Sequence, residues 1–133
     1  MIAQAKKLQD KILDIKYGRV KEGLKIGIPE IDEFIRFKRN TLAAIGHANV
    51  GKTTVLIYFY VLWAKIHKLK FLVWSSENTP QSILRKIIEF WMGIPIQKAT
   101  DAQINKAVEW ANHHFKIIEI EELYSYKQLL KEA

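Results

Sequence analysis

One stretch of the chain combines glycine, lysine and threonine at a spacing that suits the binding of a phosphate group. Glycines let a backbone wrap close to an anion, so that its amide N–H groups point inward. Lys52 then supplies a mobile positive charge for the β- and γ-phosphates, and the Thr53 hydroxyl supplies a ligand for Mg²⁺. The pattern is GxxxxGK followed by threonine, which indicates a phosphate-binding loop, or P-loop. The expected cofactor-binding residues are Gly46, His47, Ala48, Asn49, Val50, Gly51, Lys52, Thr53 and the adjoining Thr54.

The elements on either side of this loop are those that its mechanism needs. Residues 41–45 are a small apolar run stopped by Gly46, which predicts a buried strand of a parallel sheet. Residues 53–68 follow as a helix that is apolar on nearly every face, and we expect it to lie under other layers. A polyphosphate in the loop would meet the positive N-terminal end of this helix.

A second candidate residue, Glu77, follows the next expected strand, at residues 71–75. That edge of an open parallel sheet is where ligands bind. A carboxylate beside a bound γ-phosphate can orient and deprotonate an attacking water. Taken alone, Glu77 also fits a plainer interpretation, an acid favoured by the dipole of a nearby helix N-terminus.

The remaining elements are two helices, a strand and a last helix. Thr79 followed by Pro80 predicts a helix start, and capping boxes begin at Thr100 and Ser125. The order predicts an α/β fold, a parallel sheet with flanking helices. Helices are expected at residues 3–16, 31–37, 53–68, 80–92, 100–114 and from 125 onward, and strands at residues 41–45, 71–75 and 115–120.

The composition excludes several classes of protein. The chain has 133 residues, of which 49% are hydrophobic and 26% charged, and this indicates a folded domain. It has no cysteine, so disulfides, zinc knuckles and thiol nucleophiles are excluded. Its longest apolar run, residues 55–64, is half of the ~20 residues that a membrane helix needs. With no secretion signal in view, a cytoplasmic location is expected, and the net charge of +7 is compatible with a polyanionic partner.

These motifs resemble the RecA-like ATPases, and among them the DnaB-like replicative helicases. The lead-in at residues 27–34 is similar to that family's short helix with an aspartate, and the P-loop follows it as in the family. Ser75, Ser76 and Glu77, with Arg85 in the next helix, are similar to the family's glutamate signature.

The resemblance implies both a fold and an activity. It implies a P-loop NTPase with a RecA-like sheet at residues 21–133, preceded by a linker-like helix at residues 1–20. Glu77 would be the catalytic base and Lys52 would stabilise charge, with ATP and Mg²⁺ as cofactors. The complete protein would be an ATPase and DNA helicase that moves on single-stranded DNA as a ring of identical subunits.

One part of the family pattern is missing from the sequence. In the family, the Walker B strand follows the helix that begins here at Ser125, so the chain looks like the N-terminal half of an ATPase core. Glu119, after an apolar run, is a less fitting substitute for the Walker B aspartate. An alternative function is a nucleotide-binding regulatory or assembly module that does not hydrolyse ATP. A third is a basic DNA-binding protein with an accidental P-loop, whose binding would depend on salt and ignore ATP.

Other residues with chemical potential have plainer interpretations. We expect His47 to face solvent rather than phosphate, and the pair His113 and His114 to cap a helix rather than hold a metal. The first helix either docks on a neighbouring subunit or packs on its own domain. Aromatic residues expected in the core rather than stacked on bases are Tyr58, Phe59, Tyr60 and Trp63. Basic residues expected on a solvated face rather than in a DNA-binding patch are Lys38, Arg39, Lys65, Lys68 and Lys70.

Overall fold

The computed structural model describes residues 5–19, 23–38, 43–119 and 125–132. The chain divides into two compact units, Met1–Thr41 and Leu42–Ala133, and each is described by itself. Within the described ranges, every helix is too short or too polar to span a lipid bilayer.

The first unit begins with the expected amphipathic helix. Helix α1 spans Ala5–Lys16, and Gly18 ends it in the left-handed region at φ 64°. Arg19 then pairs with Asp14, with 2.9 Å between Nε and Oδ1. The prediction of a helix at this place is confirmed.

The second part of this unit is a small loop built around a buried aspartate. The short helix α2 spans Pro29–Asp32. The Asp32 carboxylate accepts hydrogen bonds from the backbone N–H groups of Ile26, at 2.6 Å, and Gly27, at 3.0 Å. The expected helix through residue 37 is wrong, because Phe37 instead pairs with Leu24 through two backbone hydrogen bonds of 2.8 and 3.0 Å. Residues 20–22, which precede this loop, lie outside the described residues.

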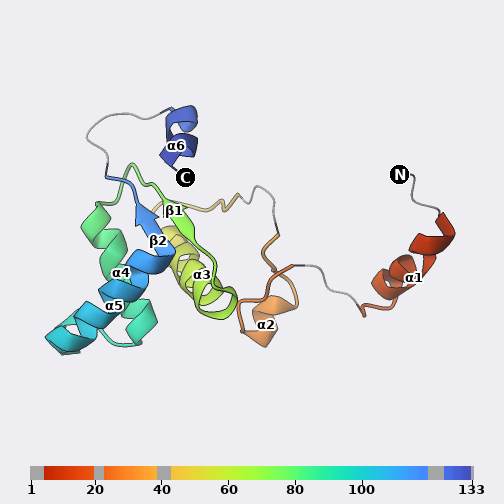
Figure 1. Cartoon of the computed structure of the whole chain (residues 1–133), viewed down its shortest axis with the longest axis horizontal. Coiled ribbons are helices and arrows are strands. Elements are labelled where there is room, and N and C mark those ends of the chain that lie inside the picture. Colours follow the sequence, from red (N-terminus) through yellow and green to blue (C-terminus); the bar gives the residue numbers. More distant parts are fainter. Residues whose placement is uncertain (1–4, 20–22, 39–42, 120–124, 133) are drawn as a thin grey trace. The chain divides into compact units, whose positions relative to one another are not determined.

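The second unit contains the longer helices and a small parallel sheet (Figure 1). The helices are α3 (Lys52–His67), α4 (Pro80–Met92), the 3₁₀ turn η1 (Ile96–Lys98), α5 (Asp101–His114) and α6 (Tyr126–Glu132). The strands are β1 (Phe71–Val73) and β2 (Phe115–Ile117).

Helix boundaries follow local capping chemistry. The Thr79 hydroxyl accepts a hydrogen bond from the Ser82 N–H at 3.2 Å, with Pro80 at the first helical position. Thr100 and Gln103 form the expected capping box of α5. Ser125 and Gln128 make the same reciprocal bonds at the start of α6. These three predicted starts are confirmed.

The sheet consists of two parallel strands. Phe71 lies opposite Phe115 and Val73 opposite Ile117, and the Ile118 N–H donates to the Val73 carbonyl at 2.9 Å. The arrangement is compatible with the predicted α/β class, because the two strands pair in parallel and helices pack against them. Both are shorter than the sequence pattern predicts, and residue 120 lies outside the described part.

The strand expected before the P-loop is not observed at residues 43–45. These residues are exposed, and the Ile45 side chain retains 96% of its accessible surface. A strand needs a neighbour for its backbone groups, and among the described residues the sheet joins β1 with β2 alone. The prediction of a buried strand is therefore wrong for residues 43–45, while residues 41 and 42 lie outside the described residues.

One hydrophobic core joins α3, α4, α5 and the sheet. The strands contribute Phe71, Val73 and Phe115 to this core. Phe71 and Val73 are two positions apart in β1, and Phe115 lies opposite Phe71, so all three lie on one face of the sheet. Tyr60 of α3 stacks on Phe71 with 5.0 Å between ring centroids, and Trp63 is fully buried. The expectation that the aromatic residues of α3 pack in the core is confirmed for Tyr60 and Trp63, while Tyr58 and Phe59 are half-buried. The fully enclosed members of this core are Ile57, Val61, Ala64, Ile83, Ile87, Ile88, Ala107, Ala111 and Phe115.

Candidate functional site

The P-loop leads directly into α3 and leaves the start of that helix open. Gly51 is the N-cap residue and adopts φ 85°, a left-handed conformation that glycine reaches without steric cost. No side chain caps the helix, so the first-turn N–H groups have no side-chain acceptor. Free N–H groups at a helix N-terminus attract anions, and the helix dipole adds to that attraction.

Lys52 folds back onto the loop. Its Nζ donates to the carbonyl oxygens of Gly46, at 2.6 Å, and His47, at 2.5 Å. These two bonds hold the ammonium group over the backbone of the same loop that was predicted to wrap a phosphate. A positive charge and an uncapped helix start therefore belong to one short segment of chain.

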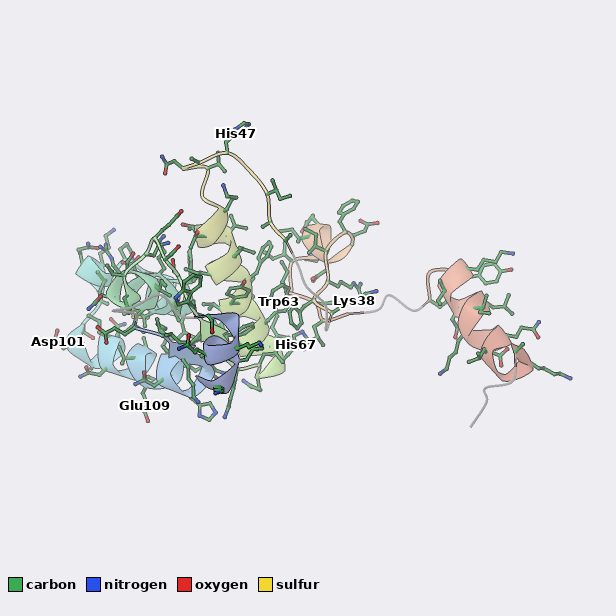
Figure 2. All side chains as sticks on the ribbon, turned by 90° about the horizontal axis from the view of Figure 1, so that it is seen from above. Lys38, His47, Trp63, His67, Asp101 and Glu109 are labelled. Carbon is green, nitrogen blue, oxygen red and sulfur yellow. The ribbon has the colours of Figure 1, made fainter. Side chains whose placement is uncertain are left out.

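The loop itself is exposed. Figure 2 shows His47 at its tip, beyond the N-terminal end of α3, while His67 is the last residue of the same helix. His47 is exposed, and so are the other residues of 43–51. The Thr53 side chain is partly buried and makes no hydrogen bond to the described residues, so its hydroxyl is available as a metal ligand.

Glu77 lies in the turn that follows β1. The Ser75 hydroxyl oxygen organises this turn by accepting from the N–H groups of Glu77, at 3.3 Å, and Asn78, at 3.0 Å. The Glu77 side chain is exposed and forms no ion pair within the described part of the chain. The structure thus brings Lys52 together with the loop carbonyls, and it does not pair Lys52 with Glu77.

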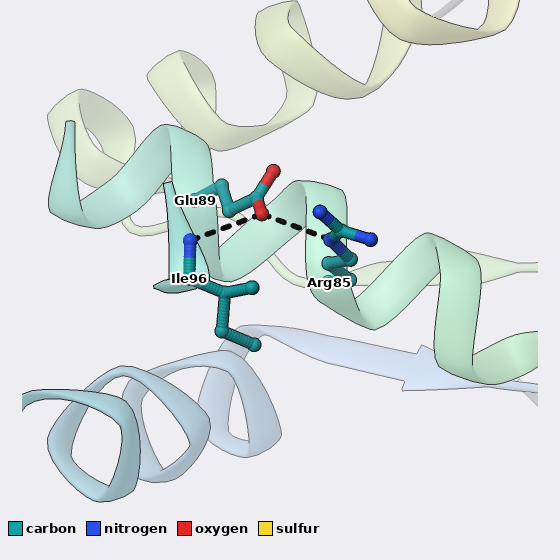
Figure 3. Close-up of polar contacts among 3 residues, drawn as sticks. All are labelled: Arg85, Glu89 and Ile96. Atoms are coloured by element: carbon teal, nitrogen blue, oxygen red, sulfur yellow. Dashed lines mark hydrogen bonds and ion pairs between the residues drawn. The ribbon is translucent and has the colours of Figure 1, made fainter. Parts of the chain in front are cut away.

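Arg85, the arginine of the glutamate signature, is engaged within α4 (Figure 3). Its Nε lies 2.9 Å from Glu89 Oε1, and the same oxygen accepts the Ile96 N–H at 3.1 Å. The hydrogen bond from Arg85 is the main reason that the pKa of Glu89 lies below its ordinary value, and the bond from Ile96 adds to it. Glu89 therefore holds the end of α4 to the start of η1.

A hollow of about 250 Å³ opens between the start of α4 and the end of α5. Its polar lining comes from Gln81, Asn112 and Glu119, and Leu84 and Ile117 are among its apolar walls. Among the acidic residues that the structure describes, Glu119 lines this open hollow at the carboxyl end of the strands, and Glu77 does not. Sequence reasoning did not predict this hollow, because packing between distant helices creates it.

The two histidines at the end of α5 have different environments. His114 is buried, and its Nδ1 donates to the Leu69 carbonyl oxygen at 2.9 Å. His113 is exposed and its ring contacts His114 edge to face. Among the residues that the structure describes, no three His, Asp or Glu side chains are grouped to hold a metal ion.

Comparison of the chain with protein-family models, with curated proteins and with solved structures finds no match. The chemistry of the loop and its helix is therefore what bears on function.

Proposed function

We propose that this chain binds ATP with Mg²⁺ through residues 46–54 and is the ATP-binding domain of a DnaB-like DNA helicase. The observation that carries the proposal is Lys52, whose ammonium group lies on the loop backbone at the uncapped start of α3. A flexible cation beside free helix N–H groups is what a polyphosphate requires.

The chemistry follows from these positions. The β- and γ-phosphates of ATP would replace the carbonyls of Gly46 and His47 as partners of Lys52. Thr53 would offer its hydroxyl to Mg²⁺, which supplies Lewis-acid stabilisation of the phosphate charge when bound. Glu77 would orient and deprotonate the attacking water, because it follows β1 at the edge where parallel sheets bind ligands.

The proposal also covers the activity of the complete protein. The complete protein would act in the cytoplasm on single-stranded DNA as a RecA-like ring of identical subunits, with hydrolysis coupled to movement. The basic net charge of +7 is compatible with such a partner.

A second candidate function is a RecA-like module that binds ATP for regulation or assembly without hydrolysing it. The exposed Glu77 carboxylate favours it, because no ion pair in the described residues holds that group in place. A phosphate-release assay on an ATP-saturated sample separates the two functions, since only the ATPase produces phosphate.

Calorimetric titration of the chain with ATP and Mg²⁺ tests the shared claim of nucleotide binding. Lys52→Ala should weaken binding by on the order of tenfold or more, because a charge-assisted contact is lost. Lys106→Ala, an exposed position on α5, is the matched control and should leave the affinity unchanged. Equal affinities of the Lys52→Ala variant and the unaltered chain would contradict the proposal.

A further inference from the structure

A second and larger hollow lies at the amino ends of the two strands, away from the turn that holds Glu77. Its volume is about 540 Å³. Lys70 and Lys116 contribute its charged lining, and Asn112 and His113 contribute hydrogen-bonding groups from the end of α5. No residue of the P-loop borders this hollow.

The positive charge in this hollow is uncompensated. Among the residues that the structure describes, none with an acidic side chain lines it. Within the described ranges, the side chains of Lys70 and Lys116 form neither an ion pair nor a hydrogen bond. Lys65 and Lys68 differ, because their ammonium groups have partners. Lys65 donates to the Trp91 carbonyl at 3.4 Å, and Lys68 donates to the Lys65 carbonyl at 3.1 Å.

The end of α5 opposes this charge only weakly. The C-terminus of a helix carries roughly half a negative charge, against two whole positive charges on the lysines. His114 also points its Nδ1–H at Leu69, so that hydrogen bond is already used. The hollow therefore remains positive, and an anion is the ligand that it suits.

The shape and floor of the hollow narrow the class of anion. Small-molecule sites commonly measure about 300–1,000 Å³, and this volume falls within that range. Leu72 supplies the apolar floor, because it pairs with Lys116 and so lies on the same face of the sheet, opposite the face whose Phe71 and Phe115 pack in the core. Charged groups around an apolar floor suit a small molecule with an anionic end and an apolar body.

We propose that this hollow binds a small phosphomonoester, with Lys70 and Lys116 on the phosphate and Leu72 beneath its apolar part. The site is separate from the proposed ATP site and does not depend on it. A chain that fails to bind ATP can still bind a phosphomonoester here.

Nuclear magnetic resonance titration of the full chain with phenyl phosphate, without Mg²⁺, tests the proposal. We expect saturable shifts of the amide signals of Leu72, His113 and Lys116, and the same shifts in the Lys52→Ala variant. Shifts confined to residues 46–54 would overturn the proposal, because the probe would then have found the P-loop alone.

Charge-matched variants separate a defined site from general attraction. The double variant Lys70→Gln and Lys116→Gln should bind phenyl phosphate on the order of tenfold more weakly, because both phosphate contacts are lost. The exposed pair Lys98→Gln and Lys106→Gln removes the same charge elsewhere and should change the affinity less than about twofold. Equal weakening in both double variants would overturn the site.

A short single-stranded oligonucleotide provides the last arm of the test. We expect it to leave the phenyl phosphate shifts in place, because the hollow is sized for one small ligand. If the oligonucleotide displaces phenyl phosphate at a lower concentration, the surface binds nucleic acid and the small-ligand proposal is wrong.

Discussion

The Nδ1 atom of His114 lies 2.9 Å from the carbonyl oxygen of Leu69 and joins the last residue of α5 to the segment before β1. A carbonyl only accepts, so Nδ1 carries the hydrogen of this bond. His114 is 5% exposed, so losing this hydrogen bond would lower the stability of the fold. This bond fixes the start of β1 beside the start of β2.

Replacing His114 should therefore destabilise the fold. His114→Ala is expected to lower the free energy of unfolding by about 1–3 kcal/mol, because the partly buried Leu69 carbonyl loses its donor and a buried side chain is removed. His114→Asn keeps a donor near the Nδ1 position and should lower the free energy of unfolding less than His114→Ala does. Urea denaturation measures both, with His113→Ala as an exposed control expected within about 0.5 kcal/mol of the unaltered chain. Equal losses at positions 113 and 114 would contradict the structural role of His114.

Gly51 allows a test that separates stability from ATP binding. Its φ is 85°, and no atom lies within 4 Å of an added Cβ, so Gly51→Ala should cost only backbone strain, about 1–2 kcal/mol. Gly93→Ala meets the same conditions at φ 74° and is the matched control. Urea denaturation should show that both variants lose a similar amount of unfolding free energy. Calorimetry should show weaker ATP binding only for Gly51→Ala. Weaker binding in both variants would point to general destabilisation instead.

Glu77 is the residue whose replacement distinguishes binding from hydrolysis. Glu77→Gln should preserve ATP affinity and, in a sample that hydrolyses ATP, reduce turnover by about 10²–10⁴-fold, because the general base is lost. Glu109→Gln, at an exposed position on α5, should change neither quantity. Phosphate release at saturating ATP is the measurement, and full turnover by Glu77→Gln would remove its role as the base.

Glu89 should make stability depend on pH in one direction. Its pKa is below the ordinary 4.5 in the folded chain, chiefly through Arg85, so the carboxylate stabilises the fold above that pH. This stability is lost as the pH falls through the lowered pKa. Glu89→Gln should cost about 0.5 kcal/mol at pH 7, since the ion pair is largely solvated.

Urea denaturation at a series of pH values checks this expectation. The difference between the unaltered chain and Glu89→Gln should shrink as the pH falls below about 4. Glu109→Gln serves as the control and should show no such convergence. A difference that stays constant down to pH 3 would contradict the role of the Arg85 bond.

Local signals predicted the helices well. Thr79 and Thr100 marked helix starts correctly because a capping bond joins residues only three positions apart. Gly18 and Gly93 marked helix ends because each adopts the positive φ that glycine favours. Such features depend on a few neighbouring residues, which a sequence displays directly.

Features that depend on distant partners were harder to predict. The apolar run at residues 43–45 resembles a strand, yet a strand forms only beside another, and Ile45 is exposed instead. Phe37 was expected in a helix but pairs with Leu24. That residues 46–54 form a P-loop stays a prediction of the motif. The motif did not predict the bonds from Lys52 to Gly46 and His47, because the side chain selects its partners only after the loop has folded.

The bond between His114 and Leu69 joins residues 45 positions apart, with α4 and α5 in the intervening chain. Bringing two residues so far apart into contact costs conformational entropy, so the contact forms slowly in an unfolded chain. Helices that have already formed shorten the flexible segment and reduce this cost. We therefore expect α4 and α5 to form early and the two strands to pair late. Rapid-mixing experiments would then find that His114→Ala mainly accelerates unfolding and leaves the folding rate nearly unchanged.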